Sequence, residues 1–482
     1  MDIHQSILKV NNSIRAYQES HDLDLLNELI LDLQQLLQHP DVTPETQPAI
    51  LLNLGFYLRE RFGRLGSLAD LEAALERFQQ AVALTPADSP DRPMYLNAWG
   101  NALRQRFERL GSLADLEAAL KRYQQAVALT PESSPDRPMY LNAWGVALLE
   151  RFERLGHLAD LEAALEHFQQ AVELTPTDSP DRPMYLNNWG NALLERFGRL
   201  GNLADLEAAL ECYQQAVALT PESSPDRPGR LNNWGVALRE RFERLGSLAD
   251  LDMALERYQQ AVALTPENSP DRAAYLNNWG VALRERFERL GTLADLEAAI
   301  EHHQQAVALT PENSPDRPGR LNNWGVALCE RFGRLGNLAD LEAALERYQQ
   351  AVALTPESSP DRPGRLNNWG VALFRRFERI GRLADLEAAL DCYQQAVALT
   401  PENHPEPNYF FEQPWKRLLS NPKISTSPPS LCRYGRCPRG AAGCQHRQSR
   451  PPKDVGRLCH CLFPAGHLLL AGWRFRSCLS LC

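Results

Sequence analysis

A tryptophan recurs every 45 residues along most of this 482-residue chain, and that period constrains the fold more than any other feature. Leu54 holds the same place in an earlier, eighth copy. A fixed period of this length is typical of a solenoid, in which short units pack on their neighbours. The period therefore overrides the three or four domains that length alone suggests. The seven tryptophans are Trp99, Trp144, Trp189, Trp234, Trp279, Trp324 and Trp369.

Two helices are predicted within each unit, as residues 275–319 show. Gly291 predicts the end of the first helix, and Thr292 with Asp295 predicts an N-cap and a first-turn acid that open the second. The second helix should end before Pro311. The buried stripe of the first helix is predicted at Leu276, Trp279, Leu283, Phe287 and Leu290, and that of the second at Leu296, Ala299, Ile300, His303, Ala306 and Val307.

We therefore expect an all-α fold, a right-handed α-α superhelical solenoid of helix-turn-helix repeats. Neither helix of a unit can bury its stripe alone, so each pair must stack on the next. Three regions are predicted: an N-terminal helical cap at 1–44, eight 45-residue repeats at 45–403, and an irregular tail at 404–482.

The repeat resembles the tetratricopeptide repeat in both of its helices. The first helix matches that family's pattern at Leu231, Trp234, Gly235 and Leu238, and the second matches it at Ala254, Tyr258, Ala261 and Pro266. The usual unit of that family has about 34 residues, so these helices and linkers are longer. Long arrays of this kind are similar to those upstream of CHAT-type peptidase domains or attached to signalling ATPases in bacterial proteins.

The resemblance implies that the first helices line a concave groove. Four places in each first helix then face the groove, illustrated by Asn277 (first), Val281 (second), Arg284 (third) and Glu288 (fourth). In this family an Asn at the first place commonly binds a peptide backbone. The candidate groove residues are Asn187, Asn232, Asn277, Asn322 and Asn367 at the first place, Val236 and Val281 at the second, and Arg239 and Arg284 at the third.

Each groove assignment has a structural alternative. The Asn row is also consistent with hydrogen bonds between helices that fix repeat stacking. The third place varies between copies, among them Leu149, Cys329 and Phe374; this variation on a solvent-facing stripe encodes partner choice or reflects neutral drift. A second row of arginines, from Arg61 to Arg376, predicts ion pairs with acids between repeats, with an anionic-ligand ladder as the alternative.

Charge and cysteine are concentrated in different parts of the chain. The whole chain has net charge −10, but residues 421–482 hold ten Lys or Arg, one acid and seven of the ten cysteines. This tail is compatible with zinc ligands around Cys459-His460-Cys461 or with a disulfide framework, and neither has the spacing that makes such an assignment strong. Our preferred hypothesis is that an out-of-frame translation truncates a longer protein.

These observations favour a non-enzymatic scaffold that binds an extended peptide or a partner domain in the groove. The alternatives are the regulatory part of a bacterial signalling protein whose CHAT-type peptidase or ATPase is missing from this chain, and a receptor for a small molecule or signal peptide. No phosphate-binding G-x-x-x-x-G-K-[ST] or H-E-x-x-H motif occurs, so no cofactor or metal is expected. Net acidity argues against nucleic acid, and no apolar run suits a membrane. We expect a cytoplasmic protein that self-associates, if at all, through its solenoid ends.

Overall fold

The computed structural model describes residues 2–400, which form 18 α-helices and no strand. A first pair comprises α1 (Ile3–Ser20) and α2 (Leu23–Leu37). The first helices of the eight repeats are α3 (Gln47–Leu65), α5 (Arg92–Leu110), α7 (Arg137–Leu155), α9 (Arg182–Leu200), α11 (Arg227–Leu245), α13 (Arg272–Leu290), α15 (Arg317–Leu335) and α17 (Arg362–Ile380). The second helices are α4 (Leu68–Leu84), α6 (Leu113–Leu129), α8 (Leu158–Leu174), α10 (Leu203–Leu219), α12 (Leu248–Leu264), α14 (Leu293–Leu309), α16 (Leu338–Leu354) and α18 (Leu383–Leu399).

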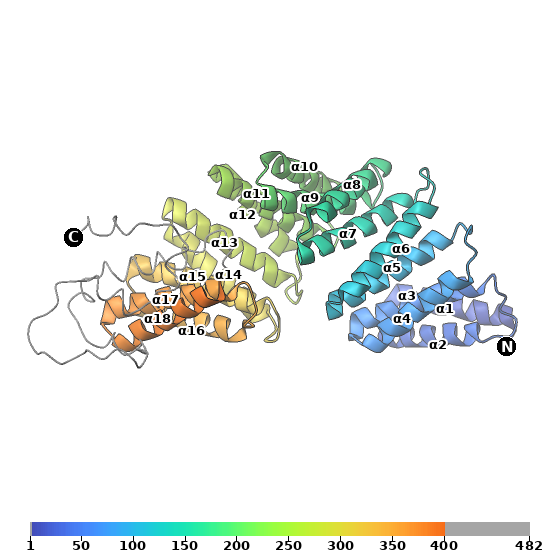
Figure 1. Cartoon of the computed structure of the whole chain (residues 1–482), viewed down its shortest axis with the longest axis horizontal. Coiled ribbons are helices and arrows are strands. Elements are labelled where there is room, and N and C mark those ends of the chain that lie inside the picture. The colour runs from blue at the N-terminus through green and yellow to red at the C-terminus, as the bar shows by residue number, and fades with distance from the viewer. Residues whose placement is uncertain (1, 401–482) are drawn as a thin grey trace, which may run out of the picture. The chain divides into compact units, whose positions relative to one another are not determined.

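The predicted all-α solenoid of paired helices is confirmed. The chain divides near the end of α16 into two compact units, one up to Ala351 and one from Val352. Within the first unit the second helices from α4 to α14 each pack against their own first helix and against the first helix of the next repeat (Figure 1). In the second unit α17 packs against α18. The roles of 1–44 as a cap and of 404–482 as an irregular tail stay predictions, and the tail falls outside the described residues.

The ends of the helices follow from a few residues in each repeat. Gly291 ends α13 in the left-handed conformation (φ 71°), as its sequence position predicts. The hydroxyl of Thr310 donates to the carbonyl of Ala306 at 2.6 Å and closes the last turn of α14. Arg317 then donates from Nη1 to the carbonyl of Val307 at 2.9 Å. The arginine that follows each proline loop thus satisfies carbonyls at the end of the preceding helix.

The predicted start of the second helix is confirmed: Thr292 is the N-cap residue of α14 and Asp295 is the acid of its first turn. The Thr292 side chain, however, makes no capping hydrogen bond. The carboxylate of Asp295 instead accepts hydrogen bonds from the Arg286 guanidinium, at 3.0 Å from Nε and 2.6 Å from Nη2. An ion pair with the first helix of the same repeat therefore replaces the local cap.

The same Arg–Asp pair recurs in all eight repeats and joins the two helices of each. The predicted ion pair between repeats is also present, in addition to the one within the repeat. Arg196 binds Asp205 of its own repeat and Glu162 of the preceding repeat, the latter at 2.8 Å. The pairs are Arg61–Asp70, Arg106–Asp115, Arg151–Asp160, Arg196–Asp205, Arg241–Asp250, Arg286–Asp295, Arg331–Asp340 and Arg376–Asp385.

The tryptophans are only half-buried, which corrects the prediction that they are core residues. The ring faces of five of the seven are covered by the residue that precedes the core aromatic of the second helix. The Arg257 guanidinium lies 4.6 Å from the centre of the Trp234 ring, and the His302 ring stacks 4.1 Å from that of Trp279. These five tryptophans therefore lie between the core and a guanidinium or imidazole group. Leu290, also predicted to be buried, is 54 % exposed, because it ends its helix at the turn.

The core of each repeat is an aromatic ring of the second helix packed directly on a glycine of the first. Tyr258 packs on Gly235 in this way, and both are buried. His303 takes the same place against Gly280 and is fully buried, yet neither of its ring nitrogens has a hydrogen-bond partner in the structure. Burial lowers the pKa of His303 to about 3, with the nearby Arg284 charge adding to the effect.

We expect His303→Phe to stabilise the protein. Phe168 occupies the position of His303 three repeats earlier and is fully buried there. Both repeats have a valine at the second place, Val146 and Val281, so a phenylalanine at residue 303 should meet the same neighbour. Removing two unsatisfied buried nitrogens should raise the free energy of unfolding by about 1–3 kcal/mol at pH 7.5.

The gain should grow on acidification. Because the folded-state pKa lies below the unfolded value, the unfolded wild-type chain takes up a proton as the pH falls from about 6.5. Thermal unfolding at pH 7.5 and pH 5 measures both effects, and Gln304→Leu, one residue further on at an exposed position, is the control. A variant as stable as the wild type at both values would contradict this expectation.

Candidate interaction face

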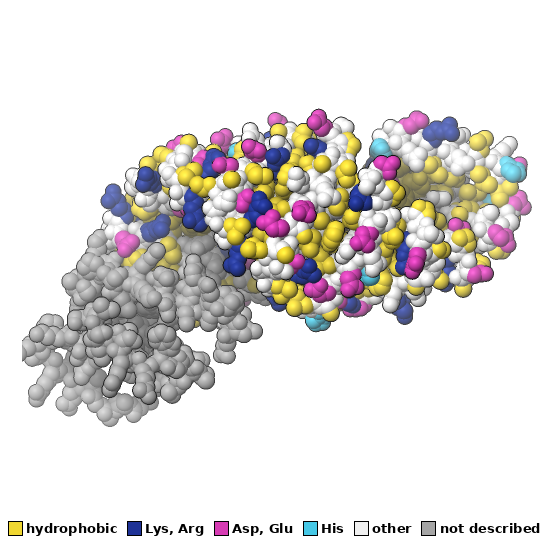
Figure 2. Space-filling model, turned by 90° about the horizontal axis from the view of Figure 1, so that it is seen from above, with side chains coloured by type: hydrophobic (Ala, Val, Ile, Leu, Met, Phe, Trp, Pro, Cys, Tyr) yellow, Lys and Arg dark blue, Asp and Glu magenta, His cyan; other side chains and the backbone are white. Residues whose placement is uncertain are grey.

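The first helices of neighbouring repeats contact one another, and the candidate residues lie along these contacts. In the unit up to Ala351, α3, α5, α7, α9, α11, α13 and α15 each touch the next in the series, while the second helices make no comparable contact among the described residues. We call the surface formed by the four predicted places on these seven helices the inner face. Acidic, basic and hydrophobic side chains are interspersed over the molecular surface seen in Figure 2.

At the first place the asparagines hydrogen-bond between repeats. The Oδ1 of Asn232 accepts from the Nδ2 of Asn278 at 3.0 Å, which joins α11 to α13. The same bond links Asn188 to Asn142 (2.9 Å), Asn233 to Asn187 (3.1 Å) and Asn323 to Asn277 (3.1 Å). The alternative role anticipated for this row, fixing repeat stacking, is therefore present in the structure. The amide oxygen of each first-place asparagine that accepts such a bond is already occupied.

Second-place side chains are half-buried. Val236 and Val281 belong to this group, and Asn101 and Asn191 hold the same place in other repeats. Each of these two asparagines accepts a hydrogen bond at 2.8 Å from the hydroxyl of the core tyrosine in its repeat. The second place therefore lies directly above the core ring, and an amide there can satisfy the ring hydroxyl.

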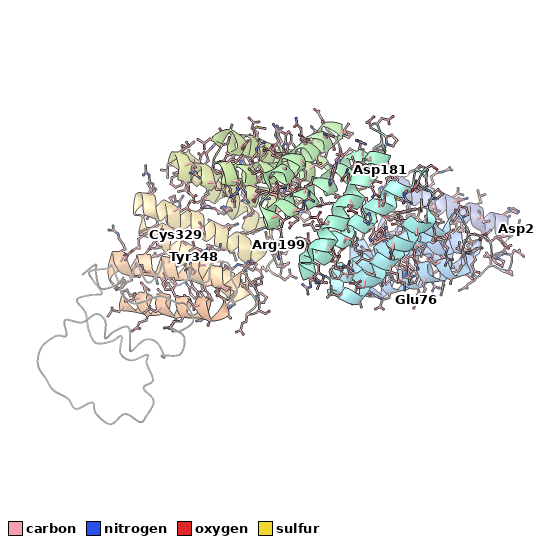
Figure 3. All side chains as sticks on the ribbon, turned by 45° about the horizontal axis from the view of Figure 1, so that its top comes forward. Asp2, Glu76, Asp181, Arg199, Cys329 and Tyr348 are labelled. Carbon is pink, nitrogen blue, oxygen red and sulfur yellow. The ribbon has the colours of Figure 1, made fainter. Side chains whose placement is uncertain are left out.

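At the third place, arginines form an ion-pair ladder along the inner face. Arg284 binds Glu288 of its own helix and Glu330 of the next repeat, the latter at 2.9 Å. Arg239 lies 3.7 Å from both Glu243 and Glu285 in the same arrangement. The prediction that the third place faces solvent holds only in part, because the Arg284 side chain is 21 % exposed while that of Glu288 at the fourth place is 49 % exposed. Cys329, at the third place of α15 in the helix pair that also carries Tyr348, is 5 % exposed (Figure 3).

Burial also changes the acids of this ladder. Desolvation raises the pKa values of Glu285 and Glu330 above the usual range for a carboxyl group, although the paired arginines oppose the shift. Glu150, the partner of Arg104, is raised in pKa for the same reason. The middle of the inner face is thus held together by ion pairs and hydrogen bonds between neighbouring repeats. Asn322, Val236 and Val281 complete the predicted set on this face, and Asn367 lies on α17 in the second unit.

Two further features of the described helices concern metal ions and membranes. No group of three His, Cys, Asp or Glu side chains that could hold a metal ion occurs in residues 2–400. The cysteine and histidine residues of the tail, considered above as zinc ligands, lie outside the described residues. Among the helices that the structure describes, none combines the length and the apolar character needed to cross a membrane.

Comparison with known proteins finds similarity to solved structures. No protein-family model matches the chain, and no curated protein matches it. Solved structures do. The tetratricopeptide protein YrrB, described as having an unusual peptide-binding site, is 18 % identical, with a TM-score of 0.32 over 50 % of this chain and 95 % of that one. The resemblance to tetratricopeptide repeats is confirmed.

Two further solved structures are similar to the chain. The nearly identical repeats of a kinesin light chain from Podospora anserina are 17 % identical, with a TM-score of 0.34 over 46 % of this chain and 96 % of that one. The C-terminal part of a tetratricopeptide protein from Cytophaga hutchinsonii is 13 % identical, with a TM-score of 0.39 over 65 % and 99 %. The finer resemblance to arrays upstream of CHAT-type domains stays a prediction.

Proposed function

We propose that the chain is a non-enzymatic scaffold that binds an extended segment of a partner protein along the inner face. The observation that carries this proposal is the continuity of the face: seven first helices present the same places 45 residues apart, each in contact with the next. A surface of this kind sums weak contacts along its length, which suits an extended ligand. A cytoplasmic location and a lost signalling effector remain secondary parts of the proposal.

The second place gives the sharper test, because linked asparagines at the first place also hold the repeats together. We expect Val236→Arg combined with Val281→Arg to reduce capture of a partner by the immobilised full-length chain at least about tenfold, since long charged side chains then stand on the inner face. Gln259→Arg combined with Gln304→Arg adds the same charge at exposed positions of the second helices α12 and α14.

The control pair should capture the partner as the wild type does. Circular dichroism and thermal unfolding of both double variants establish that any loss does not come from unfolding. Equal capture by the two double variants would place the binding surface elsewhere on the array and contradict the proposal.

A further inference from the structure

The arginine ladder of the inner face is incomplete at one position, Arg59. Elsewhere an arginine at the third place meets two acids, one four residues later and one 46 residues later. Arg104 does so with Glu108 and with Glu150, the latter at 2.6 Å. For Arg59 these two positions are Gly63 and Gln105, so both carboxylates are missing.

The guanidinium of Arg59 has no replacement partner. Among residues 2–400 it makes no hydrogen bond or ion pair, and it lies 5.6 Å from the centre of the Phe56 ring. The two nearby acids are occupied: Glu60 accepts from the Tyr17 hydroxyl and lies 3.6 Å from Arg64, and Glu108 is held by Arg104. No carboxylate of the described chain therefore serves Arg59.

An open cavity lies where the missing acids would be. It has a volume of about 470 Å³ between α3 and α5. Its wall contains Arg59 and Arg104 together with the carboxylates of Glu60 and Glu108, and the uncharged residues of the wall are Phe56, Gly63, Asn101 and Gln105. A side chain added at Gly63 would meet no atom within 4 Å, so this part of the cavity is free. The Oε1 of Gln105 is buried without a hydrogen-bond partner, and its amide group can donate to an incoming oxygen.

Arg59 is the charged residue of the wall that suits an anion, because the other three are already engaged: Arg104 with Glu108 and Glu150, and Glu60 with Tyr17 and Arg64. Burial lowers the pKa of Arg59 and the Arg104 charge adds to this shift, while Tyr123 and Glu60 oppose it. A guanidinium remains protonated under all ordinary conditions, so its charge is held in a half-buried position without an anionic partner. A carboxylate that entered the cavity would form charge-assisted hydrogen bonds there.

We propose that this cavity, the Arg59 pocket, binds the carboxylate of an acidic residue in a partner protein. The chain itself indicates the ligand chemistry, because the equivalent arginine, Arg104, is occupied by the carboxylates of Glu108 and Glu150. Phe56, whose side chain is 46 % exposed, offers a surface for an apolar residue next to the acidic one. This inference rests on the proposed function of the inner face and names one anchoring site within it.

Two short peptides test the pocket on the full-length chain. Binding of Ac-Phe-Glu-NH2 and of its neutral isostere Ac-Phe-Gln-NH2 is measured by broadening of their phenylalanine ring signals in proton NMR. We expect the glutamate peptide to bind about tenfold more tightly, as one charge-assisted contact implies. Sodium acetate at equal concentration should compete weakly. If acetate displaced the glutamate peptide at equal concentration, the pocket would be a site for small carboxylates. That result would overturn the assignment to a protein partner.

Variants then connect the preference to Arg59. Arg59→Leu introduces the residue found at the third place in two other repeats, Leu149 and Leu194, and should abolish the difference between the peptides. Gln105→Glu combined with Gly63→Glu restores the internal acids and should abolish it too, while raising the thermal stability. Arg77→Leu, on the second helix α4 of the same repeat and outside the inner face, is the matched control and should keep the preference.

The outcomes separate this inference from the broader one. Equal binding of the two peptides, no binding of either, or a preference that survives Arg59→Leu overturns the Arg59 pocket. Each of these results leaves the scaffold proposal to the Val236→Arg and Val281→Arg experiment. If the Val236→Arg and Val281→Arg variant lost partner capture but still preferred the glutamate peptide, the Arg59 pocket would bind a carboxylate independently of the rest of the inner face.

Discussion

Asp205→Ala should lower the free energy of unfolding by about 2–4 kcal/mol, because it leaves one side of a largely buried ion pair without its partner. Asp205 is 5 % exposed and binds the Arg196 guanidinium through both carboxylate oxygens, at 2.6 Å and 3.0 Å. The pair joins α9 to α10, and Arg196 also reaches Glu162 on α8. One substitution therefore loosens three helices.

The effect should be local at first. Repeats in a solenoid contact only their neighbours, so the weakened repeat should open before the ends of the array do. Hydrogen exchange should show faster exchange in α9 and α10 of the variant than in the wild type, and thermal unfolding gives the overall loss.

Glu162→Ala supplies the control on the same arginine. Its side chain is 50 % exposed, and an exposed ion pair contributes less than about 1 kcal/mol. Arg196 retains its bidentate partner in this variant. If the two variants were equally destabilised, the buried contact between Arg196 and Asp205 would contribute no more to stability than the exposed one, contrary to expectation.

The periodicity of the sequence was sufficient to predict the helix pairs and most of their limits. Gly291 shows why: its φ of 71° is a local requirement that a glycine signals by itself. The contacts across the pairs were harder to predict. Asp295 is the first-turn acid that the sequence predicts, but its ion pair with Arg286 of the other helix was not predicted, because the sequence contains no direct measure of how close the two helices lie.

The candidate site was predicted less completely than the fold. The four places were found from helical spacing, but spacing within one helix does not show what the next repeat covers. Asn232 and Arg284 were therefore assigned to an open stripe, although each binds a residue 46 positions later. A comparison of positions 46 residues apart carried the relevant signal: Glu follows Arg104, Arg239 and Arg284, and Gln follows Arg59.

Gly235→Ala tests the closest packing in the array and should destabilise it by about 1–3 kcal/mol through overpacking. An added Cβ would lie 2.7 Å from a ring carbon of Tyr258, well inside van der Waals contact, and the fully buried ring has no room to withdraw. The direction of the change in stability is informative, because replacing glycine by alanine in the middle of a helix is otherwise stabilising by about 1 kcal/mol.

Gly198→Ala is the matched control for this substitution. Gly198 lies in the first helix α9, is exposed, and has no atom within 4 Å of the position that a Cβ would take. This variant should gain about 0.5–1 kcal/mol. Opposite signs for the two variants in urea unfolding would establish that the ring, rather than the helix, requires glycine at residue 235. The double variant Gly235→Ala/Tyr258→Leu should then lose less than the sum of its single changes, because the smaller leucine leaves space for the added methyl group. Strict additivity would instead mean that the contact between Gly235 and Tyr258 does not set the distance between α11 and α12.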